Sequence, residues 1–157
     1  MLLRCCGSVR WAEAMLARRP FGSTAELHQA AETLWNGLAP DDWLEAFRHH
    51  PRIGDTGAPP ALGPEDDSAH PASEWSRQEQ SAVQHADAAT LRALREANAA
   101  YERRFGFVFL VCATGKSAEE MLRSLDARIN NEPTVELRVA SREQAKITRL
   151  RMEKLQR

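Results

Sequence analysis

The chain of 157 residues has the length of one domain, and its composition, 43% hydrophobic and 27% charged, is that of an ordinary globular protein. A formal net charge of −1 creates no overall attraction to nucleic acid or an anionic membrane, and no run of about 18 apolar residues could span a bilayer. Cys5, Cys6 and Cys112 fit no disulfide framework, and no signal peptide is recognised. We expect a single cytoplasmic domain over residues 1–157 that binds neither nucleic acid nor membrane.

The N-terminal part of the chain predicts two helices with clear boundaries. One runs from about Ser8 to Arg18 and is stopped by Pro20. The next begins at Ser23, because Ser23 and Glu26 have the spacing of a capping box and apolar side chains then recur at helical spacing.

A third helix is predicted to open at Pro40. On it Trp43, Phe47 and His50 recur at positions i, i+4 and i+7, so His50 would close the apolar stripe. Pro51 disfavours helical geometry at the residue before it, and the helix should therefore end at His50.

One long irregular segment follows, because residues 51–72 hold five of the eight prolines and three of the eight glycines. Loops of this length are usually functional or disordered. A helix is predicted from about 73 to 88 and another from about 90 to 105, which Gly106 would stop in a left-handed conformation.

The apolar run over 107–113 is either a buried extended segment or the start of a buried helix, and periodicity does not decide between them. Ser117 and Glu120 cap a further helix, and Pro133 begins the last one. No alternating strand pattern is present. The sequence therefore predicts an all-α, single-domain bundle of about seven to eight helices with one long loop.

His50 is the first candidate for chemistry, since it lies on an inward face at a helix end, before a long loop. The ordinary interpretation is a core or capping histidine. The functional interpretation is a general acid or base, because only histidine titrates near neutral pH without perturbation. Position alone leaves both open.

Ser76 and Glu79 have the spacing of a capping box. If Ser73 were the cap instead, the two would lie one turn apart on one helix face and could both point into a pocket. A carboxylate near His50 would raise the pKa of the imidazole and orient its ring. Arg151 falls near the apolar stripe of the last helix, where it either snorkels to the surface or turns inward to meet an anionic substrate.

Nucleotide and metal sites find no support in the sequence. Gly115-Lys116-Ser117 has the ending of a P-loop, but the glycine required five positions before Gly115 is Leu110. The five histidines and three cysteines show no metal-binding spacing. The helix after this turn still offers backbone N–H groups to polar ligand atoms.

Six short motifs follow one another along nearly the whole chain. They are Cys5-Cys6-Gly7-Ser8 with Arg10-Trp11-Ala12; Asp42 to Phe47; His50 to Asp55; Ser76-x-x-Glu79-Gln80; Tyr101-Glu102-x-Arg104-Phe105-Gly106-Phe107; and Lys146-Ile147-x-x-Leu150-Arg151. Together they resemble the family of 2-oxo-4-hydroxy-4-carboxy-5-ureidoimidazoline (OHCU) decarboxylases, the last enzymes in the conversion of urate to (S)-allantoin. The ordered set is specific, although no single motif would be.

The resemblance implies an all-helical homodimer that uses neither cofactor nor metal. By position His50 matches the catalytic histidine of the family, and the predicted substrate-binding set is Pro51, Ser76, Arg77, Gln78, Glu79, Gln80, Val111, Cys112, Ala113, Thr114, Gly115 and Arg151. Of these, Pro51 and the stretch 111–115 match segments that contact substrate largely through backbone. Residues 56–72 depart most from the family pattern, because they look longer and more proline-rich.

The chemistry that the resemblance implies suits these residue types. The substrate bears a carboxylate next to a conjugated C=N bond, so the ring can take up the electron pair left by CO₂. We expect His50, paired with a catalytic Glu79, to deprotonate the tertiary hydroxyl or to return the proton that fixes the S configuration. Ser76, Arg151 and the backbone around Ala113 would hold the ring and ureido groups.

Three alternatives stay open. One is a hydrolase of a related cyclic ureide that uses the same His/Glu pair to activate water. Another is a nucleic-acid-binding module that uses residues 138–157, where seven Lys or Arg stand against two Glu, although such a basic stretch is also typical of a solvated helix face. The third is a dimeric scaffold that has kept only the fold.

Overall fold

The computed structural model describes residues 1–54, 75, 78–79 and 81–155, except the side chains of residues 82 and 84. The described part contains seven α-helices, one 3-10 helix and no β-strand, which confirms the predicted all-α class. The elements are α1 (Leu2–Cys6), α2 (Val9–Ala17), α3 (Thr24–Asn36), α4 (Pro40–Phe47), η1 (Ser81–His85), α6 (Ala88–Phe105), α7 (Ala118–Arg128) and α8 (Pro133–Leu155). None of these helices combines the length and apolarity needed to cross a bilayer.

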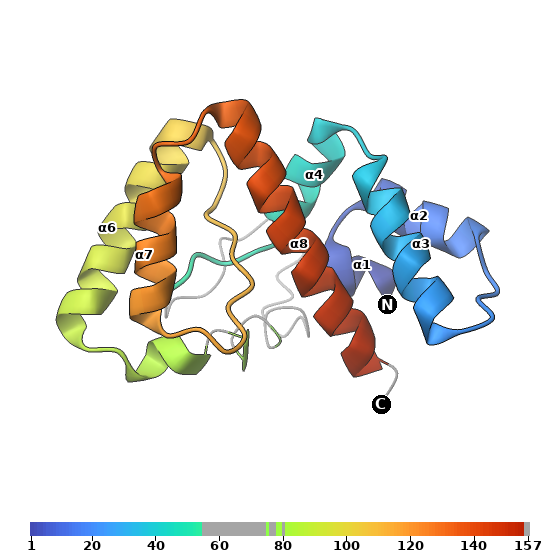
Figure 1. Ribbon diagram of the computed structural model, residues 1–157, viewed down its shortest axis with the longest axis horizontal. Helices are drawn as coiled ribbons and strands as arrows, with labels where there is room; N and C mark the ends of the chain where they lie inside the picture. The colour runs from blue at the N-terminus through green and yellow to red at the C-terminus, as the bar shows by residue number, and fades with distance from the viewer. Residues whose placement is uncertain (55–74, 76–77, 80, 156–157) are drawn as a thin grey trace, which may run out of the picture.

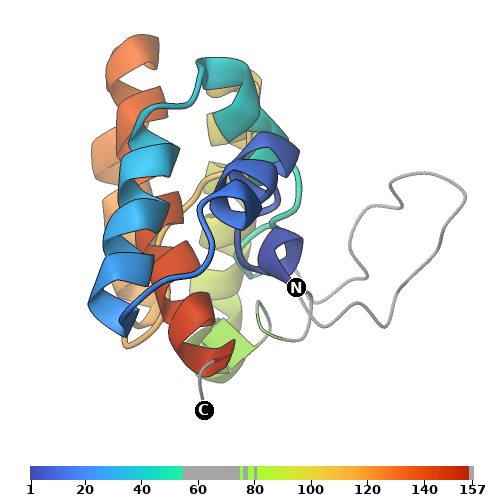
Figure 2. The same cartoon turned by 90° about the vertical axis from the view of Figure 1, so that its right-hand side faces the viewer.

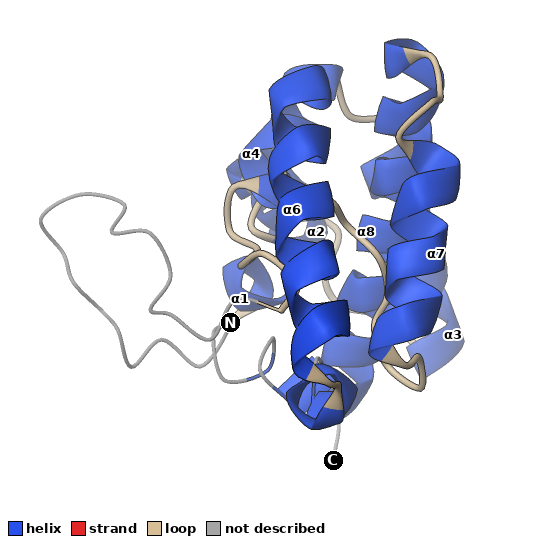
Figure 3. Ribbon diagram, turned by 90° about the vertical axis from the view of Figure 1, so that its left-hand side faces the viewer, coloured by secondary structure: helices blue, strands red, loops and turns tan. Residues whose placement is uncertain are grey.

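The helices form two groups on either side of α8 (Figure 1). The helices α6 and α7 pack against each other at one end, where Figure 3 shows them side by side. The helices α1 to α4 form the other end and face the viewer in Figure 2, with α1 and α3 packed on α8. The long last helix therefore lies at the centre of the molecule.

Each group encloses its own hydrophobic core, and the stretch 107–113 runs between them (Figure 1). This stretch is extended but forms no strand, which settles the alternative left open by its sequence. Successive residues point to opposite cores, with Leu110 and Cys112 in one and Phe109, Val111 and Ala113 in the other. Because both sides are buried, the run is apolar throughout and shows no polar alternation.

Serine side chains cap three helices near the positions where these helices were predicted to begin. Ser8 accepts a hydrogen bond from the N–H of Trp11 at 3.3 Å, and Ser23 accepts one from Glu26 at 3.1 Å. Ser117 and Glu120 form a full capping box, with bonds of 3.2 and 2.8 Å between side chains and backbone N–H groups. The side chains thus satisfy donors that a helix start leaves unpaired.

Three features of the helix pattern differ from the predictions. The short helix α1 was not predicted. The helix α4 ends at Phe47, three residues before His50, and the chain continues in tight turns. The predicted helix over 73–88 is wrong at its end, where the chain forms the 3-10 helix and Asp87 then caps α6 through the N–H groups of Ala89 and Thr90 at 2.8 and 2.9 Å. The rest of that helix and the loop over 55–72 lie mostly outside the described residues.

Candidate active site

A pocket opens between the extended stretch, the turn after α4, the second half of α8 and Glu79. It is lined by His50, Glu79, Val111, Cys112, Ala113, Thr114, Ile147 and Leu150. Its empty space, including the open mouth, is about 310 Å³. These residues are far apart in the sequence, so only folding brings them together.

His50 is positioned by the turn that follows α4. Its N–H donates to the carbonyl of Phe47 at 3.1 Å, and Phe47 is fully buried with its ring centroid 5.3 Å from that of Phe107. The imidazole is half-buried, and its Nε2 has no fully formed hydrogen bond to any described residue. Burial first, and the charge of Arg151 second, lower the pKa of His50 from 6.5 to about 3. The ring is therefore neutral at neutral pH.

Glu79 is held by a two-bond ion pair with Arg151 of α8. The Nε of Arg151 donates to Oε1 at 3.1 Å and its Nη2 donates to Oε2 at 2.9 Å. Both side chains are nearly inaccessible, at 3% exposure for the arginine and 9% for the glutamate. Lys154, one turn further along α8, places its Nζ 3.7 Å from the same carboxylate. The fork geometry fixes both the position and the plane of the carboxylate.

This ion pair changes the predicted relation between Glu79 and His50. The two side chains line one pocket, but the described contacts of the carboxylate are with Arg151 and Lys154. The predicted rise in the pKa of His50 is wrong in direction, because the carboxylate is balanced by the guanidinium and burial disfavours the imidazolium. Arg151 points inward, as its second interpretation predicted, but the anion that it meets in the structure is the Glu79 carboxylate.

The backbone of the extended stretch is held by side chains from three other segments. Arg128 donates from Nη1 to the carbonyl of Leu110 at 2.7 Å. The Cys112 N–H donates to Glu143 Oε2 at 2.8 Å, and the Cys112 carbonyl accepts from Lys116 Nζ at 2.8 Å. Since an extended chain without strand neighbours has unpaired backbone groups, these bonds fix the pocket wall.

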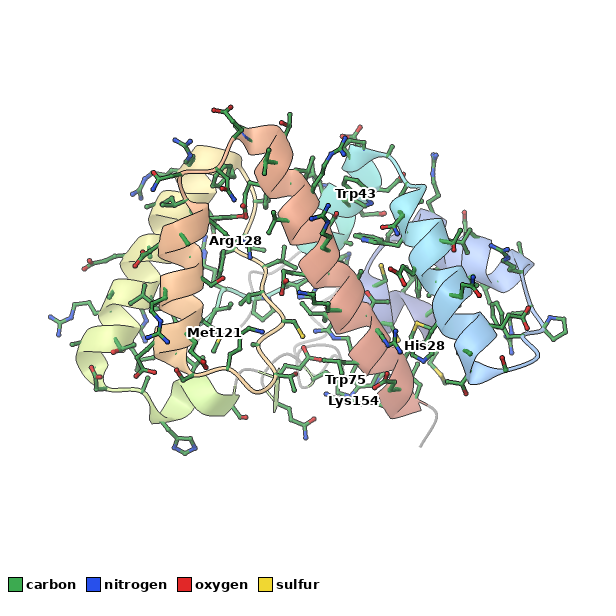
Figure 4. All side chains as sticks on the ribbon, in the orientation of Figure 1. His28, Trp43, Trp75, Met121, Arg128 and Lys154 are labelled. Carbon is green, nitrogen blue, oxygen red and sulfur yellow. The ribbon has the colours of Figure 1, made fainter. Side chains whose placement is uncertain are left out.

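Arg128 belongs to a buried polar network between α7 and α8. Figure 4 shows it projecting from α7 into the space beside the extended stretch. Its Nη2 lies 2.5 Å from Glu136, which is fully buried and also accepts from the Tyr101 hydroxyl and from Asn131 Nδ2. Burial and the bond to the carboxylate raise the pKa of Tyr101 well above its usual value. Each buried charge thus has several partners, as burial requires.

The structure brings together six of the predicted site residues, namely His50, Glu79, Val111, Cys112, Ala113 and Thr114. Arg151 reaches them through Glu79, Gln78 is exposed with its Oε1 3.4 Å from Lys154 Nζ, and Pro51 and Gly115 flank the lining residues. The predicted residues Ser76, Arg77 and Gln80 lie outside the described residues.

Sequence reasoning missed the apolar wall formed by Ile147 and Leu150, although their spacing of three on the stripe before Arg151 carried the signal. It also missed the backbone anchors Arg128 and Glu143, for which the sequence gives no local signal.

The arrangement offers a neutral imidazole, a carboxylate paired with a guanidinium, and an apolar wall around a small cavity. A neutral imidazole can accept a proton and return it. In the described ranges no three His, Cys, Asp or Glu side chains come together as metal ligands. Lys116 of the Gly-Lys-Ser turn donates to the chain's own backbone. The pocket therefore suits acid–base chemistry on a small polar molecule.

Comparison with known proteins agrees with the motifs. The family model described as OHCU decarboxylase matches residues 1–153. The chain is 40% identical over 151 residues to the uric acid degradation bifunctional protein TTL of Arabidopsis thaliana, covering 96% of this chain and 45% of that protein. It is 30% identical over 142 residues to the 2-oxo-4-hydroxy-4-carboxy-5-ureidoimidazoline decarboxylase of Amia calva, covering 90% of this chain and 77% of that one.

The fold has a match among solved structures as well. A crystal structure of OHCU decarboxylase in the presence of (S)-allantoin superimposes with a TM-score of 0.80 at 37% identity, covering 98% of this chain and 94% of that one. The chain spans less than half of the plant relative's length, so it corresponds to one part of that bifunctional protein. The family model, the relatives and the fold lead to one conclusion: the chain belongs to the OHCU decarboxylase family.

Proposed function

We propose that this protein converts 2-oxo-4-hydroxy-4-carboxy-5-ureidoimidazoline to (S)-allantoin and CO₂, without metal or cofactor, with His50 as the proton-transferring residue. The observation that carries the proposal is the neutral imidazole in one small pocket with the Glu79–Arg151 pair, in a chain of this family. Such a site needs no external electron acceptor, because the substrate ring supplies one.

The proposed reaction balances with the groups at hand. The bond from the ring carbon to the carboxylate breaks, CO₂ leaves, and the electron pair moves toward the C=N nitrogen, which takes up one proton from solvent. The hydroxyl proton passes to neutral His50, and the imidazolium delivers it to the carbon that bears the ureido group while the hydroxyl becomes a carbonyl. Delivery to one face sets the S configuration.

The other predicted residues are proposed to bind and orient the substrate. Glu79 would meet the ureido N–H groups in the orientation that its ion pair with Arg151 fixes, and the backbone of 111–115 would meet the ring amides. Ser76, Arg77, Gln78, Gln80 and Pro51 complete the proposed substrate-binding set. Acid–base catalysis is worth roughly 10²–10⁴-fold, so this binding and its electrostatics must supply the remaining acceleration.

The test replaces His50 by Asn and follows substrate freshly generated from urate. We expect kcat to fall by roughly 10²-fold or more and the product to lose its S excess, as circular dichroism reports. The matched control is His85→Asn, an exposed histidine outside the pocket, which should keep the wild-type rate. Wild-type rate and chirality in folded His50→Asn would contradict the assignment. A ureide product without release of CO₂ would favour the hydrolase instead.

We further propose that the protein is a homodimer in the cytoplasm. The family resemblance supports the dimer, and the three cysteines, all free and buried, fit a reducing compartment. Light scattering coupled to size-exclusion chromatography tests the first point, since a particle with the 17.6 kDa mass of one chain would contradict it.

A further inference from the structure

Gln144 lies in the buried face of α8 and has no part in the proposed chemistry. It is fully buried, and its Oε1 has no fully formed hydrogen bond to a described residue. His50 Nε2 is also buried without such a bond. The two side chains are neighbours, since a hydrogen-bond interaction with Gln144 acts to raise the pKa of His50, against the larger effect of burial. Two unpaired buried atoms on neighbouring groups call for a common explanation.

The Cys5 carbonyl of α1 determines the direction of the hydrogen bonds that involve Thr148 and Gln144. The Cys5 carbonyl lies in the last turn of α1, where carbonyls lack helical partners and can only accept. The Thr148 hydroxyl lies 3.5 Å from this carbonyl and therefore donates its one proton to it. Thr148 also interacts with the Cys6 thiol, but sulfur is a weaker acceptor than a carbonyl oxygen, so the hydroxyl proton goes to Cys5. Thr148 Oγ1 then accepts from Gln144, whose Nε2 lies 3.1 Å away.

These donor and acceptor assignments fix the orientation of the Gln144 amide. Since its NH₂ group faces Thr148, its Oε1 faces away from Thr148 and can only accept a hydrogen bond. An acceptor next to a buried ring nitrogen favours the tautomer in which that nitrogen carries the proton. His50 Nε2 would then be the N–H donor, and Nδ1 would carry the lone pair.

We infer that Gln144 is a positioning residue that sets the tautomer of His50, so that Nε2 bears the proton and Nδ1 is the base. The inference rests on the proposed function for its catalytic meaning, but the tautomer is a property of the folded protein alone. Among the described residues, the charged groups that act on the ring are Arg151 of α8 and the adjacent His49, and the Glu79 carboxylate lines the same pocket. Arg151 has no acceptor, and His49 acts on the ring through its charge and not through a hydrogen bond, so neither takes the place of the amide oxygen.

The direct test reads the tautomer without any activity measurement. Protein labelled with ¹⁵N-histidine gives long-range ¹H–¹⁵N correlations that distinguish the two neutral forms, and the His50→Asn spectrum assigns the signals. We expect the Nε2–H form in the wild type. In Gln144→Met, which keeps the length but removes the acceptor, we expect a mixture of forms. An Nδ1–H wild type, or a Gln144→Met protein with the wild-type tautomer, would overturn the inference.

Kinetics add a readout that a merely structural role would leave unchanged. Gln144→Met should lower kcat roughly 10-fold to 100-fold, within the usual worth of acid–base help, with KM changed less than about 2-fold. Gln144→Glu keeps an acceptor but adds a negative charge, so the acid limb of the pH–rate profile should move to higher pH. The exposed Gln29→Met is the matched control and should behave as wild type. Unchanged kcat and pH profile in both Gln144 variants would contradict the inference.

Variants of Thr148 distinguish loss of its hydrogen bond to Gln144 from misfolding. Thr148→Ser keeps the hydroxyl and should keep tautomer and kcat, whereas Thr148→Val removes it and should behave like Gln144→Met. Equal effects of Ser and Val would refute the chain of bonds. If wild-type protein released no CO₂ from the ureidoimidazoline, the proposed function would fail, while the tautomer measurement would still decide the role of Gln144.

Discussion

The lowered pKa of His50 makes the free energy of unfolding depend on pH in one direction. In the folded chain burial, and then Arg151, hold this pKa at about 3, whereas in the unfolded chain it returns to about 6.5. Between these values the unfolded state binds a proton that the folded state does not bind. Stability from the neutral ring is therefore present above about pH 6.5 and is lost as pH falls toward about 3.

The size of the effect follows from the same two values. Each pH unit in this window changes the free energy of unfolding by about 1.4 kcal/mol, so going from about pH 7 to about pH 5 costs about 2 kcal/mol. Asparagine at position 50 does not titrate, and the loss should be absent in His50→Asn. The two proteins differ only at position 50, so the difference between them isolates the imidazole.

Urea unfolding followed by circular dichroism at several pH values between about 5 and 7 measures this difference. We expect the stability of the wild type relative to His50→Asn to fall by about 2 kcal/mol across the range. His85→Asn, at an exposed position, controls for the loss of a surface imidazole. Parallel curves for wild type and His50→Asn, within about 0.5 kcal/mol, would refute the buried neutral ring.

Three further substitutions test the rest of the structure. Arg128→Met leaves a buried carboxylate without its cation and should cost about 3–5 kcal/mol in urea unfolding, whereas an effect as small as that of the exposed Arg123→Met would count against the network. Ser117→Ala removes a helix cap and should lower Tm by about 2–4 °C, for a loss of about 1 kcal/mol, and an unchanged Tm would contradict the cap. Glu79→Gln leaves the charge of Arg151 unbalanced, so the pKa of His50 should fall further and the acid limb of the pH–rate profile should move to lower pH. An unchanged profile would argue against this coupling.

Local features of the sequence predicted the parts of the fold that depend on local chemistry. Ser8, Ser23 and Ser117 begin helices because a hydroxyl next to an unpaired backbone N–H acts within three residues. The end of α4 was predicted three residues too late, because the rule for Pro51 gives only the last position a helix can reach. The 3-10 helix over Ser81–His85 was not predicted. Asp87 caps α6 just after it, so only a short turn precedes the start of α6.

The site residues could be predicted from the ordered motifs, but their contacts could not. Glu79 and Arg151 are 72 positions apart, and nothing local in either segment indicates that they pair. The prediction joined Glu79 to His50, because a carboxylate and an imidazole make a familiar pair. The structure offers the carboxylate a guanidinium fork with two bonds, and two charge-assisted bonds in a buried place are worth more than one to a ring that burial keeps neutral.

The helix α8 shows why the centre of this protein was the hardest part to predict. Its charged sequence is typical of a solvated helix, yet Glu136, Gln144, Thr148 and Arg151 are all buried. Each has a partner or neighbour on another element, so the side chains that join the two cores also orient the groups around the pocket. Replacing a complete buried ion pair by apolar residues often stabilises a protein, whereas removing one partner alone destabilises it. In this helix we expect that gain to be accompanied by a loss of activity, because the stability of the fold and the geometry of the site depend on the same residues.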